Sequence, residues 1–155
     1  MMKTGIIKTL LWCGFVSSAA LAANSALALC SDGRHPDAVA ELKVGDMVAT
    51  VIVVSRLDES SPDDPQGIED TLYTVRVLDI FKGKPGPSLK IRSENTSSRF
   101  PMDVGKKYLL FITNDGQAHF VDSCGRSGLL KDRAMELEAL RKQVSRHCRG
   151  GRVAQ

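Results

Sequence analysis

Few residues of this chain have the types and spacing that chemistry at a protein site requires. Beyond the first 28 residues, the soft potential metal ligands are three cysteines and three histidines: Cys30, Cys124, Cys148, His35, His119 and His147. Structural zinc sites draw on closely spaced pairs such as Cys-x-x-Cys, and the sequence contains no such pair. The sequence therefore predicts neither a metal site nor a cofactor.

A nucleophile with an acid–base partner is not evident either. Ser127 lies in Gly-Arg-Ser-Gly, which lacks the Gly-x-Ser-x-Gly spacing of a nucleophile elbow. Asp79 interrupts an apolar strand face and is a candidate functional carboxylate, although pairing with Arg or Lys at a barrel edge is the more common arrangement. The histidines have no adjacent acid and nucleophile that would suggest a triad. We therefore expect no catalytic residues and no enzymatic activity.

The most acidic stretch runs from Asp58 to Asp70 and contains six carboxylates together with Pro62, Pro65 and Gly67. Calcium binding is one interpretation of so many oxygen ligands, but the alternating Asp and Gly placement of an EF-hand loop is missing. Proline and glycine break regular structure, so a solvated hairpin loop explains this composition better.

The first 28 residues have the composition of a secretory signal peptide. Lys3 and Lys8 are followed by an uncharged stretch that reaches Ala26-Leu27-Ala28, and this order of regions is typical of exported proteins. A membrane anchor is the competing interpretation, but the apolar core Ile6–Val16 is shorter than the roughly 20 residues that span a bilayer. We expect cleavage, a secreted or periplasmic location, and no integral membrane segment in the mature chain.

Cleavage after Ala28 starts the mature chain at Leu29, whereas the earlier site Ala20-Leu21-Ala22 would start it at Ala23. Loss of residues 1–28 removes two basic residues and no acidic residue, which lowers the formal net charge from +3 to +1. So small a charge argues against nucleic acid as the partner. In an oxidising compartment, two of the three remaining cysteines are expected to pair and one is left over.

Strands dominate the predicted secondary structure. Apolar runs separated by Gly, Pro and Asn-Asp-Gly turns predict five of them: Met47–Leu57, Thr71–Phe81, Ser88–Ser93, Lys107–Thr113 and Gln117–Asp122. One or two helical turns are predicted within residues 36–42. The C-terminal segment changes to helical spacing, with five apolar residues on one face: Leu130, Ala134, Leu137, Leu140 and Val144.

These elements predict a mainly β fold with a C-terminal helix. Five antiparallel strands of this length are buried most economically by rolling into a small closed barrel. The strand Met47–Leu57 is apolar at nearly every position, so we expect it to be central in the sheet. One domain is predicted from residue 29 to 145, followed by a flexible basic tail at residues 146–155.

Four segments occur in a suggestive order along the mature chain. They are Cys30 with His35-Pro36; Val77–Gly83, of the form V-x-x-x-F-K-G; Gly105–Phe111, of the form G-x-x-Y-L-L-F; and Cys124–Leu130, similar to C-x-R-T-x-P-L. In this order and spacing they resemble the tissue inhibitors of metalloproteinases and the wider netrin-like family, in its bacterial secreted branch. The resemblance implies a netrin-like OB barrel.

The resemblance also implies a disulfide. Bacterial members typically begin with Cys-x-Cys and pair one of these cysteines with a Cys-Gly that precedes the G-x-x-Y-L strand. In this chain Ala28 and the segment Ser98–Pro101 stand at those places, so the disulfide that remains joins Cys30 to Cys124. Cys148 lies outside the resemblance, and three alternatives stay open for it: a free thiol, a disulfide-linked dimer, or competition for Cys124.

The resemblance and the composition lead to three functional hypotheses. The principal one is a non-catalytic protein-binding module with an unidentified protein partner. The alternative is a metalloendopeptidase inhibitor whose partner is a protease; zinc chelation by an N-terminal cysteine would require cleavage directly before Cys30, and signal peptidases rarely accept Leu29 at the preceding position. The further alternative is an OB fold that binds oligosaccharide or an anionic surface.

The resemblance places partner binding on a ridge formed by the N-terminal segment and a neighbouring loop. The residues of this ridge are Leu29, Cys30, Ser31, Arg34, His35, Phe100 and Met102. Phe100 and Met102 are large apolar side chains in an otherwise polar loop, which is a common way to present a binding anchor. The alternative is that both side chains fold back and plug the mouth of the barrel.

Overall fold

The computed structural model describes residues 37–150, with side chains up to residue 146. Its helices are α1 (Ala38–Val44), the 3₁₀ turn η1 (Leu130–Asp132) and α2 (Ala134–Gly150). Its strands are β1 (Met47–Glu59), β2 (Asp70–Lys82), β3 (Ser88–Glu94), β4 (Lys107–Asn114), β5 (His119–Phe120) and β6 (Gly128–Leu129). The predicted signal peptide, both cleavage sites and the residues 29–35 of the ridge lie outside the described part.

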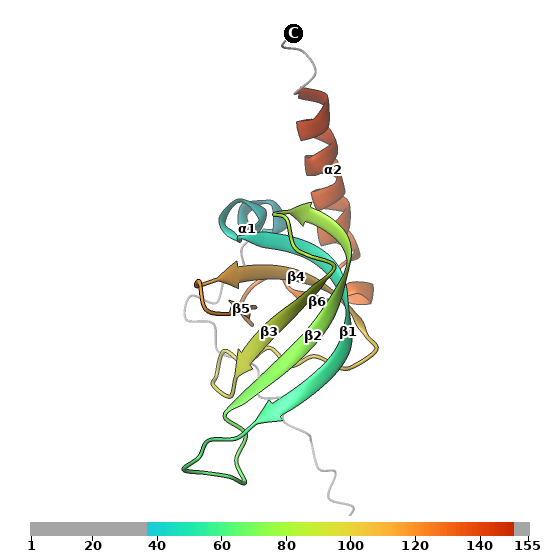
Figure 1. The fold of residues 1–155 in the computed structure, drawn as a ribbon. Coiled ribbons are helices and arrows are strands. Elements are labelled where there is room, and N and C mark those ends of the chain that lie inside the picture. The colour runs from blue at the N-terminus through green and yellow to red at the C-terminus, as the bar shows by residue number, and fades with distance from the viewer. Residues whose placement is uncertain (1–36, 151–155) are drawn as a thin grey trace, which may run out of the picture.

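The strands form a closed barrel. Around the barrel they follow the order β1, β2, β3, β5 and β4, and β4 pairs back onto β1 through Met47–Ile52. β1 can serve both neighbours because register shifts against β2 bend it across the barrel. Figure 1 shows the barrel with α1 and α2 gathered at one end. The predicted fold class, a mainly β five-stranded OB-like barrel with a C-terminal helix, is confirmed.

The fifth strand differs from its prediction. The expected strand Gln117–Asp122 is reduced to the two residues of β5, and β5 pairs with β3 in parallel, so the barrel is mixed rather than wholly antiparallel. Turns at both ends explain the shortening. The Asp115 carboxylate accepts hydrogen bonds from the N–H groups of Gln117 and Ala118, both at 2.8 Å, and Asp122 accepts one from Cys124 N at 2.8 Å. The short strand β6 had no signal in the sequence and pairs with the start of β4.

The barrel interior is built from the alternating side chains of the strands. On β3 the buried residues Leu89, Ile91 and Ser93 alternate with exposed neighbours, as expected for a strand with one covered face. The cluster inside the barrel comprises Ala49, Val51, Val53, Tyr73, Val75, Leu89, Ile91, Met102, Tyr108, Leu110, Ile112 and Val121. As predicted, β1 is central, but only in its first half; its second half leaves the barrel as a hairpin with β2.

The two helices cover a second cluster on the outer face of β1 and β4. Its buried members are Ala38, Val48, Leu109, Phe111 and Leu140. Asp37 fixes the start of α1, since its Oδ1 accepts hydrogen bonds from Val39 N at 2.7 Å and Ala40 N at 3.0 Å. Helix α2 presents Leu140 to this cluster, as its apolar spacing predicted, and continues to Gly150, beyond the boundary expected at residue 145.

Within residues 37–150, no helix has the length and apolar character needed to cross a bilayer.

Candidate functional site

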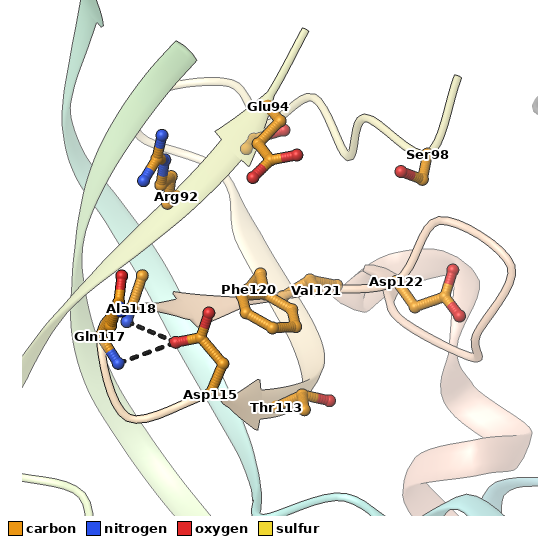
Figure 2. A pocket seen from close by; sticks show the side chains of 11 residues that line it. Arg92, Glu94, Ser98, Thr113, Asp115, Gln117, Ala118, Phe120, Val121 and Asp122 are labelled. Carbon is orange, nitrogen blue, oxygen red and sulfur yellow. Dashed lines mark hydrogen bonds between the residues drawn. The ribbon is translucent and has the colours of Figure 1, made fainter. Parts of the chain in front are cut away.

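A cleft of about 500 Å³ opens in the side of the barrel between β3 and the hairpin of β4 and β5. Figure 2 shows side chains from both walls facing it. Its lining residues are Arg92, Ser93, Glu94, Ser98, Thr113, Asp115, Gln117, Ala118, Phe120, Val121 and Asp122. A concave site of this volume lies within the usual range for ligand-binding pockets. The cleft is therefore the candidate functional site.

The cleft exists because β3 and β5 barely pair. Ile91 and His119 form their one registered pair, and β3 then continues to Glu94 while β5 ends at Phe120. Among the described residues, no strand pairs with β3 on this side from Arg92 to Glu94. Backbone N–H and C=O groups of a strand edge are hydrogen-bonding groups that an added chain can use.

The cleft carries more negative than positive charge. Among the described residues that line it, Arg92 is the one basic residue, and its Nε donates a hydrogen bond at 3.0 Å to Oδ2 of the buried Asp70. The carboxylates of Glu94, Asp115 and Asp122 remain on the walls. The N–H groups of Ala118 and Gln117 lower the pKa of Asp115, so this carboxylate stays ionised through the physiological range. The site therefore favours a positively charged group.

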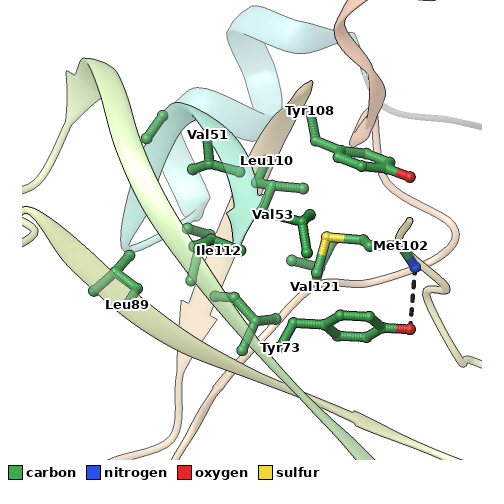
Figure 3. Packing of buried hydrophobic residues seen from close by; sticks show 12 residues of the cluster. Val51, Val53, Tyr73, Leu89, Met102, Tyr108, Leu110, Ile112 and Val121 are labelled. Atoms are coloured by element: carbon green, nitrogen blue, oxygen red, sulfur yellow. Dashed lines mark hydrogen bonds between the residues drawn. The ribbon is translucent and has the colours of Figure 1, made fainter. Parts of the chain in front are cut away.

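The loop residues Phe100 and Met102 lie against the barrel interior. Met102 is 3% exposed and belongs to the cluster inside the barrel, and its N–H donates a hydrogen bond to Tyr73 Oη at 3.1 Å (Figure 3). Phe100 is half-buried and meets Tyr108 edge-to-face, with ring centroids 6.2 Å apart. Ser93 ties the loop down, because its Oγ accepts a hydrogen bond from Phe100 N at 3.1 Å. Of the two interpretations, the structure shows the plug for Met102, which has too little exposed surface to serve as an anchor.

The remaining ridge residues precede the described part of the chain. Leu29, Cys30, Ser31, Arg34 and His35 lie outside the described residues, so the ridge and the inhibitor mechanism that depends on it stay predictions. Intact mass of the exported protein decides the point most simply, since only a mature chain that begins at Cys30 offers the chelating terminus.

Ser127 and Asp79, the two side chains considered for chemistry in the sequence, have structural partners. Ser127 Oγ accepts a hydrogen bond from Phe111 N at 2.8 Å and is buried. Asp79 was expected to pair with Arg or Lys, but its partner is Thr50. Asp79 Oδ2 accepts a hydrogen bond from Thr50 Oγ1 at 3.0 Å, and Asp79 N donates one to Thr50 Oγ1 at 3.1 Å. These bonds join opposite residues of β1 and β2. Within the described part, no three His, Cys, Asp or Glu residues gather as metal ligands.

The segment after the cleft is anchored on α1 by a buried carboxylate. Glu41 is 9% exposed, and its Oε2 accepts a hydrogen bond from Arg126 N at 2.7 Å. A Cβ atom at Gly125 would collide with Glu41 Oε1, so a larger residue there would force the Glu41 carboxylate to shift. Cys124, which directly precedes Gly125, is disulfide-bonded. The described side chains include no second cysteine, so pairing with Cys30 stays a prediction.

Glu41 should make the stability of the protein depend on pH. Burial raises the pKa of Glu41 above its ordinary value, with Asp122 adding to the effect, so its favourable contribution is complete below about pH 4.5 and is lost as the pH rises through the folded-state pKa. A Glu41→Gln variant keeps an acceptor for Arg126 N without the charge. Its stability relative to the wild type should therefore rise as urea titrations move from about pH 4 to about pH 7.

The Glu41→Ala variant is the control for this prediction. It leaves Arg126 N without its acceptor and, like the Gln variant, carries no charge, so it should be less stable than Glu41→Gln by about 1–3 kcal/mol at every pH. A Gln variant whose stability follows that of the wild type in parallel across the range would contradict the role assigned to burial.

One segment of the sequence carried a signal from which the cleft could have been predicted. Asn114-Asp115-Gly116 predicts a hairpin turn, and Gly116 does adopt a φ of +91° there. The Asp115 carboxylate also caps the next two N–H groups, however, and this capping shortens the following strand. Phe120, 36% exposed, lies in the cleft, although the sequence does not single it out as a site residue. A scan against protein-family models and a search of curated proteins found no match for this chain.

Proposed function

We propose that this protein is an exported, non-catalytic protein-binding module that engages its partner at the cleft beside β3. The observation that carries the proposal is the strand edge from Arg92 to Glu94, which borders a cleft and has no strand partner on that side among the described residues. An extended segment of another protein can add to such an edge through main-chain hydrogen bonds, with side-chain pockets providing specificity.

The side chains around this edge indicate which segment fits. Glu94 stands on β3, and Asp115 and Asp122 stand on the opposite wall, so a Lys or Arg of the partner would meet carboxylates from both sides. Phe120 offers an apolar surface between them. Complementary charge speeds association and suppresses wrong partners, while the apolar contact contributes affinity. A basic, extended segment with one apolar side chain matches this lining.

Exposure of the aromatic residues supports a protein partner over an oligosaccharide or nucleic acid. Sites that stack sugars or bases present several aromatic faces. Here Tyr73, Tyr108 and Phe111 are buried in the two clusters, and Phe120 is the one aromatic side chain among the cleft-lining residues. A single ring beside three carboxylates is a poor platform for polyanions.

Charge reversal in the cleft tests the proposal. The mature wild-type chain is immobilised and offered the periplasmic fraction, beside a Glu94→Lys variant and an Asp63→Lys control in the exposed β1–β2 loop. A protein retained by the wild type and the control should be retained roughly tenfold less by Glu94→Lys, which corresponds to about 1.4 kcal/mol of binding free energy. Equal retention by all three would contradict the cleft as the site, and release of the retained protein by oligosaccharide would support the glycan alternative.

A further inference from the structure

One edge of the second half of β1 pairs with no strand in the part of the chain that the structure describes. β1 pairs with β2 from Val48 to Glu59 but with β4 only over Met47–Ile52. The last bond on the β4 side runs from Gly105 N to Val53 O at 2.9 Å. From Val54 to Glu59, no described residue pairs with this side of β1, and Figure 1 shows this part of the hairpin extending away from the barrel.

This edge is unusually apolar for an exposed strand. Val54 and Leu57 are 53% and 58% exposed, and Val104, the neighbour of Gly105 in the chain, is 54% exposed. A strand edge that presents both apolar side chains and unpaired backbone groups is a template for pairing with another chain. Arg56 and Asp58 flank Leu57 in the chain and form an ion pair with each other at 2.8 Å.

We propose that the β1 edge of one copy pairs with the β1 edge of a second copy, antiparallel and centred on Leu57, to form a two-fold symmetric dimer. The two Leu57 side chains then meet at the axis. Arg56 of each copy stands opposite Asp58 of the other, because in this register the residue numbers of every opposite pair add up to the same value. An interface of this kind is self-complementary, as two-fold symmetry requires.

Charge selects this register over its neighbours. A register centred on Arg56 places two guanidinium groups opposite each other, and one centred on Asp58 does the same with two carboxylates. Directly opposed like charges destabilise strand pairs, whereas opposite charges stabilise them. Both side chains are more than one-third exposed in a single copy, so they are accessible to a second one.

The dimer leaves the proposed binding cleft open. In the sheet, β2 lies between β1 and β3, so a strand separates the β1 edge from the cleft beside β3. Six residues a copy make a small contact area, well below that of permanent dimers, so dimerisation should depend on concentration in the micromolar range or above. The inference is independent of what the cleft binds.

Charge-swap variants test the pairing. The Arg56→Asp variant opposes carboxylates and Asp58→Arg opposes guanidinium groups, so each alone should sediment as a monomer between about 5 and about 500 µM, where the wild type shifts to the dimer. An equimolar mixture of the two should dimerise again, because each opposite pair then joins Arg to Asp. The double variant Arg56→Asp/Asp58→Arg should also dimerise. Non-reducing denaturing electrophoresis separates this dimer from one linked through Cys148.

Two outcomes would overturn the proposal. A wild type that stays monomeric at every concentration would mean that Arg56 and Asp58 guard the edge against pairing. A dimer that survives both single variants would place the interface elsewhere. Circular dichroism melts of each variant show that it is folded. Arg56→Asp should melt close to the wild type because Arg56 is exposed, whereas Asp58→Arg should melt somewhat lower, because Asp58 Oδ1 accepts a hydrogen bond at 2.9 Å from Oγ1 of the buried Thr71.

Discussion

A Met102→Ser variant is expected to lose about 2–4 kcal/mol of unfolding free energy, the range for truncating a large buried apolar side chain. Met102 fills the mouth of the barrel at 3% exposure, and its backbone N–H is held by Tyr73 Oη at 3.1 Å. The smaller serine leaves a cavity in the cluster and places a hydroxyl among apolar side chains. Urea unfolding followed by circular dichroism measures the loss.

Val104→Ser is the matched control, because it lies in the same loop and is 54% exposed. It should change the unfolding free energy by no more than about 0.5 kcal/mol, as is usual for surface positions. Partner retention should be unchanged in both variants under conditions where they are folded. Retention lost in Met102→Ser with stability unchanged would mean that the loop is a binding anchor and not a plug.

The second large effect concerns the predicted disulfide. If Cys124 pairs with Cys30, a loop of about ninety residues is closed, and opening it should remove on the order of 4 kcal/mol of stability in the chain-entropy account. Cys30→Ala should therefore be far less stable than Cys148→Ala, whose loss should be small. Urea unfolding of both variants without reductant gives the comparison.

Peptide mapping of the oxidised wild type checks the same point covalently. A linked peptide pair containing Cys30 and Cys124 is the expected product. A pair containing Cys124 and Cys148, together with a larger stability loss in Cys148→Ala than in Cys30→Ala, would reverse the assignment.

The barrel could be predicted because its strands carry strong local signals. The long apolar run of β1 and the alternation of β3 determine which residues must be covered, and the Pro- and Gly-containing segments at residues 62–67 and 83–87 separate the strands. Closure follows from burying such strands without free edges. These are local properties of the chain, and the structure has four strands within two residues of their predicted bounds.

The cleft and the open β1 edge could not be predicted in the same way. The cleft depends on the side chain of Asp115 capping two N–H groups, which ends the hairpin strand early, and on β3 running past β5. In the sequence, Met102 resembles an anchor because no neighbouring residue indicates that it is buried. Its contact Tyr73 lies 29 residues away along the chain. Such outcomes are decided by tertiary contacts that composition and periodicity do not contain.

The most direct test of the proposed function is photo-cross-linking in living cells. A photoreactive benzoylphenylalanine replaces Phe120 in one strain, Glu94 in a second, and Asp63, in the exposed β1–β2 loop and not among the cleft-lining residues, in a third. The cleft account predicts that positions 120 and 94, which line the cleft from opposite walls, give an adduct with the same protein after illumination, and that position 63 gives none. Adducts from position 63 alone, or no adduct from either cleft position, would contradict the account.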